Sequence, residues 1–223
     1  VLPDHRVPKI LSNVSSAHFL PENIMNNLNL TLSNLIGSRI CHDLISPIGA
    51  INNGLELIEI KGDQVGSEMR LIEQSCAAAS ARIQFFRIAY GAALDGQIIS
   101  NRETVQIING AIQSNRLAVL WHPKGDFPRR EIQLAFLLLQ CFETALPYGG
   151  TIHVGRKAST WLISGEADRL EVDTELWRHL VRPSPKTEIS PAHVQFALLS
   201  ECVFQTGRQL QVEQTEQMLQ VTL

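Results

Sequence analysis

Long hydrophobic runs are missing from this sequence, and so is any large excess of charge of one sign. The longest apolar runs are short, such as residues 134–139, whereas a membrane span needs roughly 18 to 20 apolar residues. Residues 1–17 contain no apolar core typical of a signal peptide. The formal net charge is −3 without a polybasic stretch, which argues against partners such as nucleic acid or a membrane surface. We therefore expect a cytoplasmic protein.

Cysteine is also scarce and scattered. The four cysteines are Cys41, Cys76, Cys141 and Cys202, and none of them belongs to a C-x-x-C pair. This spacing argues against a disulfide framework and against a zinc knuckle. The seven histidines are equally dispersed. We expect the chain to bind no metal and no other cofactor.

The composition is that of a globular protein, with 44% hydrophobic and 18% charged residues. A length of 223 residues suffices for one large domain or two small ones. Residues 1–21 carry three prolines and no periodicity, so we expect a flexible leader there. We predict a helical hairpin over residues 22–94 and an α/β domain over residues 95–223.

The hairpin is predicted from apolar spacing. A helix over residues 22–60 places six apolar residues on one face: Ile40, Leu44, Ile48, Ile51, Leu55 and Ile58. After a turn at residues 61–66, a second helix over residues 67–94 has a similar stripe: Ile72, Cys76, Ala79, Ile83, Phe86 and Tyr90. Because an isolated hairpin would leave one apolar face in water, we predict a homodimer with a four-helix bundle.

The remaining chain mixes helices and strands. Ser100-x-x-Glu103 is a capping box, and Ser190-Pro191 is typical of a helix start. We predict helices at 100–113, 128–146, 173–181 and 190–206, and strands at 117–121, 151–155, 160–164, 208–212 and 217–223. The predicted fold class is α+β, with an α/β sandwich after the hairpin.

The most informative stretch for function is residues 41–47. His42 is two positions from both Ile40 and Leu44, so its side chain points about 200° away from theirs, outside the bundle core. Asp43 adjoins it, and Ser46 lies one turn further along. Pro47 removes an N–H from the helix and tends to bend it there. A lone surface histidine is usually inert, but these neighbours favour a functional one.

The segment His42-Asp43-Leu44-Ile45-Ser46-Pro47 resembles the phosphoacceptor box of histidine kinases. Together with residues 48–57, residues 82–91 and residues 145–151, it resembles more narrowly the ChpT-type histidine phosphotransferases of bacterial cell-cycle phosphorelays. The resemblance covers roughly residues 25–223. In that family the second domain is similar to a kinase ATP-binding domain that has lost its nucleotide site.

Three positions in this chain fit that loss. Thr144 stands where a kinase needs a magnesium-binding Asn, and residues 165–169 lack the Asp-x-Gly-x-Gly spacing. Residues 190–194 occupy the place of the glycine-rich lid. Glycines are needed there because backbone N–H groups close around phosphates. We therefore expect no ATP binding and no autokinase activity.

The resemblance implies a phosphotransferase in which His42 accepts a phosphoryl group from an aspartate of a receiver domain and passes it to a response regulator. Asp43 would orient the imidazole or handle its proton. The expected contact patch for receivers shares the His42 face: Ser38, Arg39, Ser46, Gly49 and Asn53. The expected partners are a second copy of the chain, the receiver of a hybrid histidine kinase, and response regulators. Magnesium is expected in the receiver.

Other functions remain open at this point. A diverged histidine kinase would bind nucleotide and phosphorylate His42 itself. A dimeric scaffold would bind receivers without chemistry and would tolerate His42→Ala. Ser46 could instead position a water molecule, which would make the protein a phosphatase for its receiver.

Overall fold

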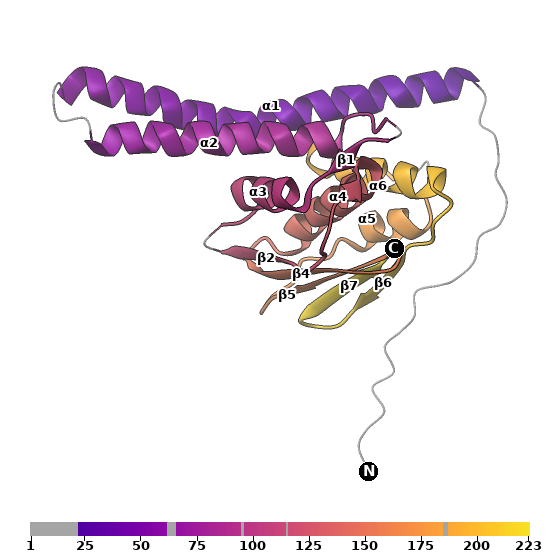
Figure 1. Cartoon of the computed structure of the whole chain (residues 1–223). Coiled ribbons are helices and arrows are strands. Elements are labelled where there is room, and N and C mark those ends of the chain that lie inside the picture. The colour runs from indigo at the N-terminus through magenta and orange to yellow at the C-terminus, as the bar shows by residue number, and fades with distance from the viewer. Residues whose placement is uncertain (1–21, 62–65, 95, 115, 185–186) are drawn as a thin grey trace, which may run out of the picture.

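The structure is a computed structural model, and it describes residues 22–61, 66–94, 96–114, 116–184 and 187–223, with side chains except those of residues 22–30 and 61. In these ranges a helical hairpin is followed by an α/β domain that lies below it (Figure 1). The predicted α+β class is confirmed. The predicted leader at residues 1–21 lies outside the described residues.

Two long antiparallel helices form the hairpin: α1 (Glu22–Lys61) and α2 (Gly66–Ala89). Their close approach depends on Gly54, which is buried between them. A Cβ atom on Gly54 would lie 2.6 Å from Cγ1 of Ile72, so a larger residue would push the helices apart. This explains a glycine in the middle of a helix, where it is otherwise unfavourable.

Helix α2 ends at Ala89, so the predicted end at Leu94 is wrong. Side chains of the α/β domain donate hydrogen bonds to carbonyl groups in its last turn and just after it. Arg129 donates to the carbonyl oxygen of Arg87. Gln133 donates to those of Ala89 at 3.1 Å and Gly91 at 3.0 Å. Helix ends need such partners, and here they also attach the hairpin to the following domain.

The α/β domain has four α-helices and a five-stranded sheet in its described part. The helices are α3 (Asn101–Ala111), α4 (Arg129–Ala145), α5 (Thr174–Val181) and α6 (Val194–Gln205), the last preceded by the 3-10 turn η1 (Pro191–His193). The strands are β2 (Leu117–Trp121), β4 (Gly150–Lys157), β5 (Thr160–Glu166), β6 (Gln211–Gln214) and β7 (Met218–Thr222). Each matches a predicted element to within a few residues.

The sheet order is β2-β4-β5-β7-β6. Strand β2 is parallel to β4, and the remaining pairs are antiparallel. A separate two-residue pair joins β1 (Ile98–Ile99) to β3 (Phe127–Pro128), which the sequence analysis missed. The predicted cap is confirmed, because the Ser100 hydroxyl accepts a hydrogen bond from the backbone N–H of Glu103 at 3.1 Å.

The helices of the α/β domain lie between the hairpin and the sheet (Figure 1). Helix α4 is the centre of this layer and is buried along almost its whole length. Phe136 of α4 stacks on Phe85 of α2, with ring centroids 4.5 Å apart. Helix α6 and η1 contact α1. Within the described residues, the domain therefore supports the hairpin from one side and leaves its other sides uncovered.

Candidate functional site

His42 lies on α1 with its side chain 83% exposed. The predicted outward orientation is confirmed. A rigid helix presents the imidazole, and little of the same chain covers it. Another protein could therefore approach the ring directly.

Asp43 contacts one nitrogen of the His42 ring. Its Oδ1 lies 3.2 Å from Nδ1 of His42, whereas its side chain is only 9% exposed. A carboxylate accepts hydrogen bonds, so this contact favours a proton on Nδ1 and leaves the lone pair on Nε2. The free nitrogen is the one distal to the backbone, as the family resemblance implies.

The second oxygen of Asp43 is held by two arginines. Nε of Arg39 donates to Oδ2 at 3.1 Å, and Nη1 of Arg82 on α2 lies 3.8 Å from the same atom. Arg39 also donates from Nη1 to the backbone oxygen of Ala192 in η1, at 2.7 Å. The partly buried carboxylate is thus compensated by positive charge from both helices of the hairpin.

Two further side chains that interact electrostatically with Asp43 have raised pKa values: Tyr90, just after α2, and Glu143 on α4. Burial raises the pKa of Tyr90 to about 12, despite a hydrogen bond from Gln140 at 3.0 Å. Burial likewise raises the pKa of Glu143 to about 7, and the positive charges of Arg82 and Arg39 only partly offset this effect. We call the set of Arg39, Asp43, Arg82, Tyr90 and Glu143 the seam cluster.

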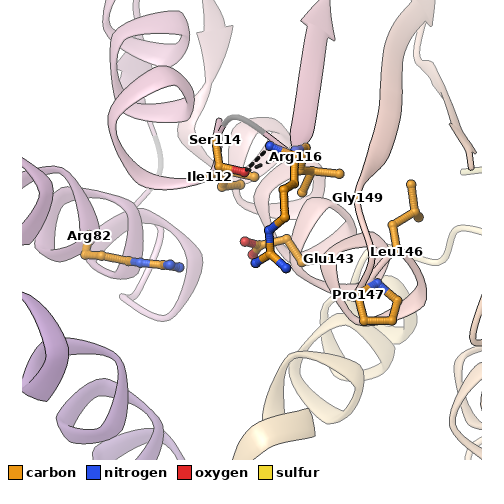
Figure 2. Close-up of a pocket in the computed structure, with 9 residues that line it drawn as sticks. Arg82, Ile112, Ser114, Arg116, Glu143, Leu146, Pro147 and Gly149 are labelled. Carbon is orange, nitrogen blue, oxygen red and sulfur yellow. Dashed lines mark hydrogen bonds between the residues drawn. The ribbon is translucent and has the colours of Figure 1, made fainter.

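A cavity of about 220 Å³ opens beside the seam cluster (Figure 2). Arg82 enters it from α2, Glu143 from α4, and Arg116 from the segment before β2. Oε2 of Glu143 is buried without a hydrogen-bond partner in the described part of the chain. The cavity therefore places a carboxyl of raised pKa among cationic side chains.

The structure separates the residues that were predicted to contact receivers. Ser38, Ser46 and Asn53 are exposed, and Gly49 is partly exposed with no atom within 4 Å of where its Cβ would be. Arg39 is turned toward Asp43 and Ala192 instead.

Sequence reasoning missed Arg82, Tyr90 and Glu143 as neighbours of the site. Only folding brings these distant positions together, and no spacing signal in the chain relates them to His42.

Thr144, which the family resemblance places at the magnesium-binding position of a kinase, has its hydroxyl engaged in two hydrogen bonds. It donates to the backbone oxygen of Gln140 at 3.1 Å and accepts from Nε2 of Gln195 at 3.1 Å. Gln195 is buried and belongs to α6. Trp177 of α5 packs edge-on against Phe142 of α4 and Phe196 of α6. The Thr144 hydroxyl is thus engaged by groups of α4 and α6.

Residues 101–218 match the family model described as the histidine phosphotransferase C-terminal domain. The chain belongs to this family. The match runs from α3 into β7, so it covers the α/β domain and leaves α1, with His42, outside.

Two relatives extend the comparison. The protein phosphotransferase ChpT of Brucella abortus (strain 2308) is 40% identical over 139 residues, which is 58% of this chain and 63% of that protein. The aligned segment thus spans less than two thirds of the curated relative. A solved bacterial phosphotransferase, determined at 1.7 Å, is similar with a TM-score of 0.71 and 29% identity, covering 86% of this chain and 95% of the other.

Among the described residues, no helix has the length and apolar character needed to span a bilayer. The same residues contain no cluster of three or more His, Cys, Asp or Glu side chains that could hold a metal ion.

Proposed function

We propose that this chain is a phosphorelay intermediate, in which His42 accepts a phosphoryl group from a receiver aspartate and passes it to the aspartate of a response regulator. The observation that carries the proposal is the exposed imidazole whose Nδ1 lies 3.2 Å from a carboxylate oxygen of Asp43. The family membership and the relatives described above support the same reaction class.

The reaction begins with neutral His42. The Nε2 lone pair forms a bond to phosphorus while the bond between phosphorus and the aspartyl oxygen breaks, and that oxygen leaves as a carboxylate. The ring keeps its proton on Nδ1 and becomes a phosphorylated imidazolium. Asp43 stabilises the positive charge that develops on the ring. The reverse sequence transfers the group to the second receiver, so this chain neither gains nor loses a proton overall.

Receivers would dock on the face of α1 around His42. Ser38, Ser46 and Asn53 offer small or polar exposed side chains there, and Gly49 keeps the surface low. In-line phosphoryl transfer needs close approach and charge neutralisation more than extra side-chain chemistry. Magnesium would come with the receiver. We expect the relay to operate in the cytoplasm.

The chain would take part without ATP. The hydrogen bond between Thr144 and Gln195 supports this view, since it engages the side chain at the position that the family resemblance assigns to magnesium binding in a kinase. The two functional units would be the hairpin at residues 22–94 and the α/β domain at residues 95–223.

The active form would be a homodimer. Ile48 and Leu55, from the predicted apolar stripe of α1, are each 49% exposed in the single chain. Ile83 of α2 is similarly exposed. A second hairpin would cover these residues in a four-helix bundle. Light scattering should give twice the mass of one chain, and Ile48→Asn with Leu55→Asn should give a monomer. Leu162→Asn, at a residue of similar exposure on β5, is the matched control and should leave the dimer intact.

The decisive test follows a labelled phosphoryl group from one receiver to another. The purified chain is incubated with a phosphorylated receiver and then with a second receiver, in parallel with His42→Gln. Wild type should gain and lose the label, whereas His42→Gln should gain none. Labelling by ATP alone would establish a diverged kinase. Binding of receivers without any label on His42 would establish a scaffold. Release of inorganic phosphate that Ser46→Ala abolishes would establish a phosphatase.

A further inference from the structure

Arg39 connects the α/β domain to the functional site. Its side chain is only 18% exposed, and its two hydrogen bonds run to different parts of the molecule. Nε holds Oδ2 of Asp43 on the same helix, and Nη1 holds the backbone oxygen of Ala192 in η1. One planar guanidinium thus spans the seam between the hairpin and the α/β domain, directly beneath the carboxylate that contacts His42.

Helix stability does not account for this ion pair. Arg39 precedes Asp43 by four residues, and a basic residue on the N-terminal side is the weaker order for such pairs. Asp43 is moreover almost fully covered. A covered carboxylate requires partners, and Arg39 provides the shorter of its two arginine contacts.

The pair has a consequence for the neighbouring ring. With Oδ2 held by Arg39, rotation of the carboxylate is restricted and Oδ1 remains 3.2 Å from Nδ1 of His42. The tautomer of an imidazole is set by the hydrogen bond of one nitrogen, which leaves the other free. A carboxylate that turned away would release the Nδ1 proton and allow the unreactive tautomer.

We propose that Arg39 is a positioning residue of the phosphotransfer reaction. Anchored by the Ala192 carbonyl, it holds Asp43 in the orientation that keeps the proton on Nδ1 and the lone pair on Nε2. The α/β domain thereby acts on the chemistry of His42 without touching the imidazole. This inference rests on the proposed function and assigns a part in it to the α/β domain.

The alternative role for Arg39 is direct contact with a receiver, as the sequence pattern suggested. A double-mutant cycle separates the two roles, because a residue that acts through Asp43 has nothing to act on once Asp43 is replaced. The variants are Arg39→Gln, Asp43→Asn and the double variant, made in the full chain. Arg178→Gln is the matched control, since Arg178 also forms an ion pair within a helix, with Glu175, far from the site in sequence.

Two quantities are measured. The first is the rate of phosphoryl transfer from a labelled receiver. The second is the nitrogen NMR shifts of the His42 ring without any receiver, at about pH 8.5, where free imidazole is neutral. Arg39→Gln should slow transfer about tenfold to a hundredfold and move the ring toward the Nε2–H tautomer. In the Asp43→Asn background it should change the rate less than about twofold, because the coupling energy is then lost.

Three results would overturn the inference: an unchanged tautomer in Arg39→Gln, an unchanged rate, or an equal loss of rate in the Asp43→Asn background. If Arg39→Gln does not fold by circular dichroism, Arg39→Lys takes its place. The single ammonium group of lysine cannot form both hydrogen bonds of the Arg39 guanidinium in the same geometry. The tautomer of His42 should therefore shift in the same direction by a smaller amount. Failure of wild type to accept the labelled phosphoryl group would instead refute the proposed function. The spectra recorded without a receiver test the role of Arg39 independently of phosphoryl transfer, so the two failures can be distinguished.

Discussion

The hairpin and the α/β domain differ in how completely they bury their apolar side chains. In the domain, Phe136, Phe142 and Trp161 are completely buried. In the hairpin, Ile48 and Leu55 remain about half exposed although they belong to the main apolar stripe of α1. The domain buries these aromatic side chains in its own core, whereas the hairpin leaves apolar side chains of its main stripe exposed in the single chain.

A similar contrast separates the two sides of α1. His42 on the outer side is exposed to solvent, whereas Asp43 next to it is covered by Arg39 and Arg82. The exposed imidazole and the arginines that cover its neighbouring carboxylate therefore lie on different sides of one helix. The following changes test this division, beginning with the largest expected effect.

Phe136→Ala should lower the free energy of unfolding by about 3 to 5 kcal/mol, because it leaves a cavity in a fully packed core and removes the stacking on Phe85. Ile60→Ala on the hairpin, where the residue is 80% exposed, should cost at most about 0.5 kcal/mol. Urea denaturation of both variants measures the difference. Equal losses would contradict the comparison of the two regions.

Glu143→Gln should change how stability depends on pH. The folded-state pKa of Glu143, about 7, is above its ordinary value of 4.5 because of burial. The folded state therefore holds a proton that the unfolded state has lost between these values, and wild type loses stability as pH rises through this window. Relative to Glu143→Gln, wild type should lose about 2 to 3 kcal/mol from pH 5 to pH 8, as measured by urea denaturation. Parallel curves for the two proteins would show that Glu143 titrates normally.

Two glycines of α1 should respond to alanine with opposite signs. At Gly54 the new Cβ would meet Ile72 at 2.6 Å, and the strain should exceed the gain in helix propensity, for a net loss of about 1 kcal/mol. At Gly49 the space is open, so alanine should stabilise the helix by about 0.5 to 1 kcal/mol. Thermal unfolding distinguishes the two. A stabilising Gly54→Ala would mean that α1 and α2 are not in close contact there.

Arg82→Gln should have the smallest effect. Its contact with Asp43 is long, at 3.8 Å, and its side chain is partly exposed, so phosphoryl transfer should slow only about twofold, roughly 0.4 kcal/mol. Because the Arg82 charge lowers the pKa of Glu143, its loss should raise that pKa above about 7. Carbon NMR of the Glu143 carboxyl measures the shift. A lower pKa in the variant would exclude the proposed electrostatic contact.

Much of the fold follows from local rules. Apolar spacing predicted both helices of the hairpin, and alternation with turn residues predicted the five strands of the main sheet. The predicted end of α2 was wrong because the carbonyl groups at the true end accept hydrogen bonds from Arg129 and Gln133. These two residues belong to α4, which is distant in sequence. The pair β1–β3 was missed because two residues are too short to show a period.

The candidate site likewise has residues that local sequence patterns predicted and residues that only distant contacts bring in. His42 and Asp43 were found because they are adjacent in a recognisable motif on a helix of predictable phase. Arg39 was noticed for its face of the helix and assigned to receivers, but its hydrogen bonds run to Asp43 and Ala192. The role of Glu143 depends on burial and on charges from two other helices, which no local pattern carries.

The sequence by itself determined that a histidine stands on the outer face of a long amphipathic helix beside a carboxylate, because helical periodicity fixes which residues share a face. Only the tertiary structure decided that Arg82 of α2 lies beside that carboxylate and that the Ala192 carbonyl in η1 anchors Arg39. The physical reason is that hydrogen bonds and burial act over a few ångströms in space, between residues that the chain places far apart.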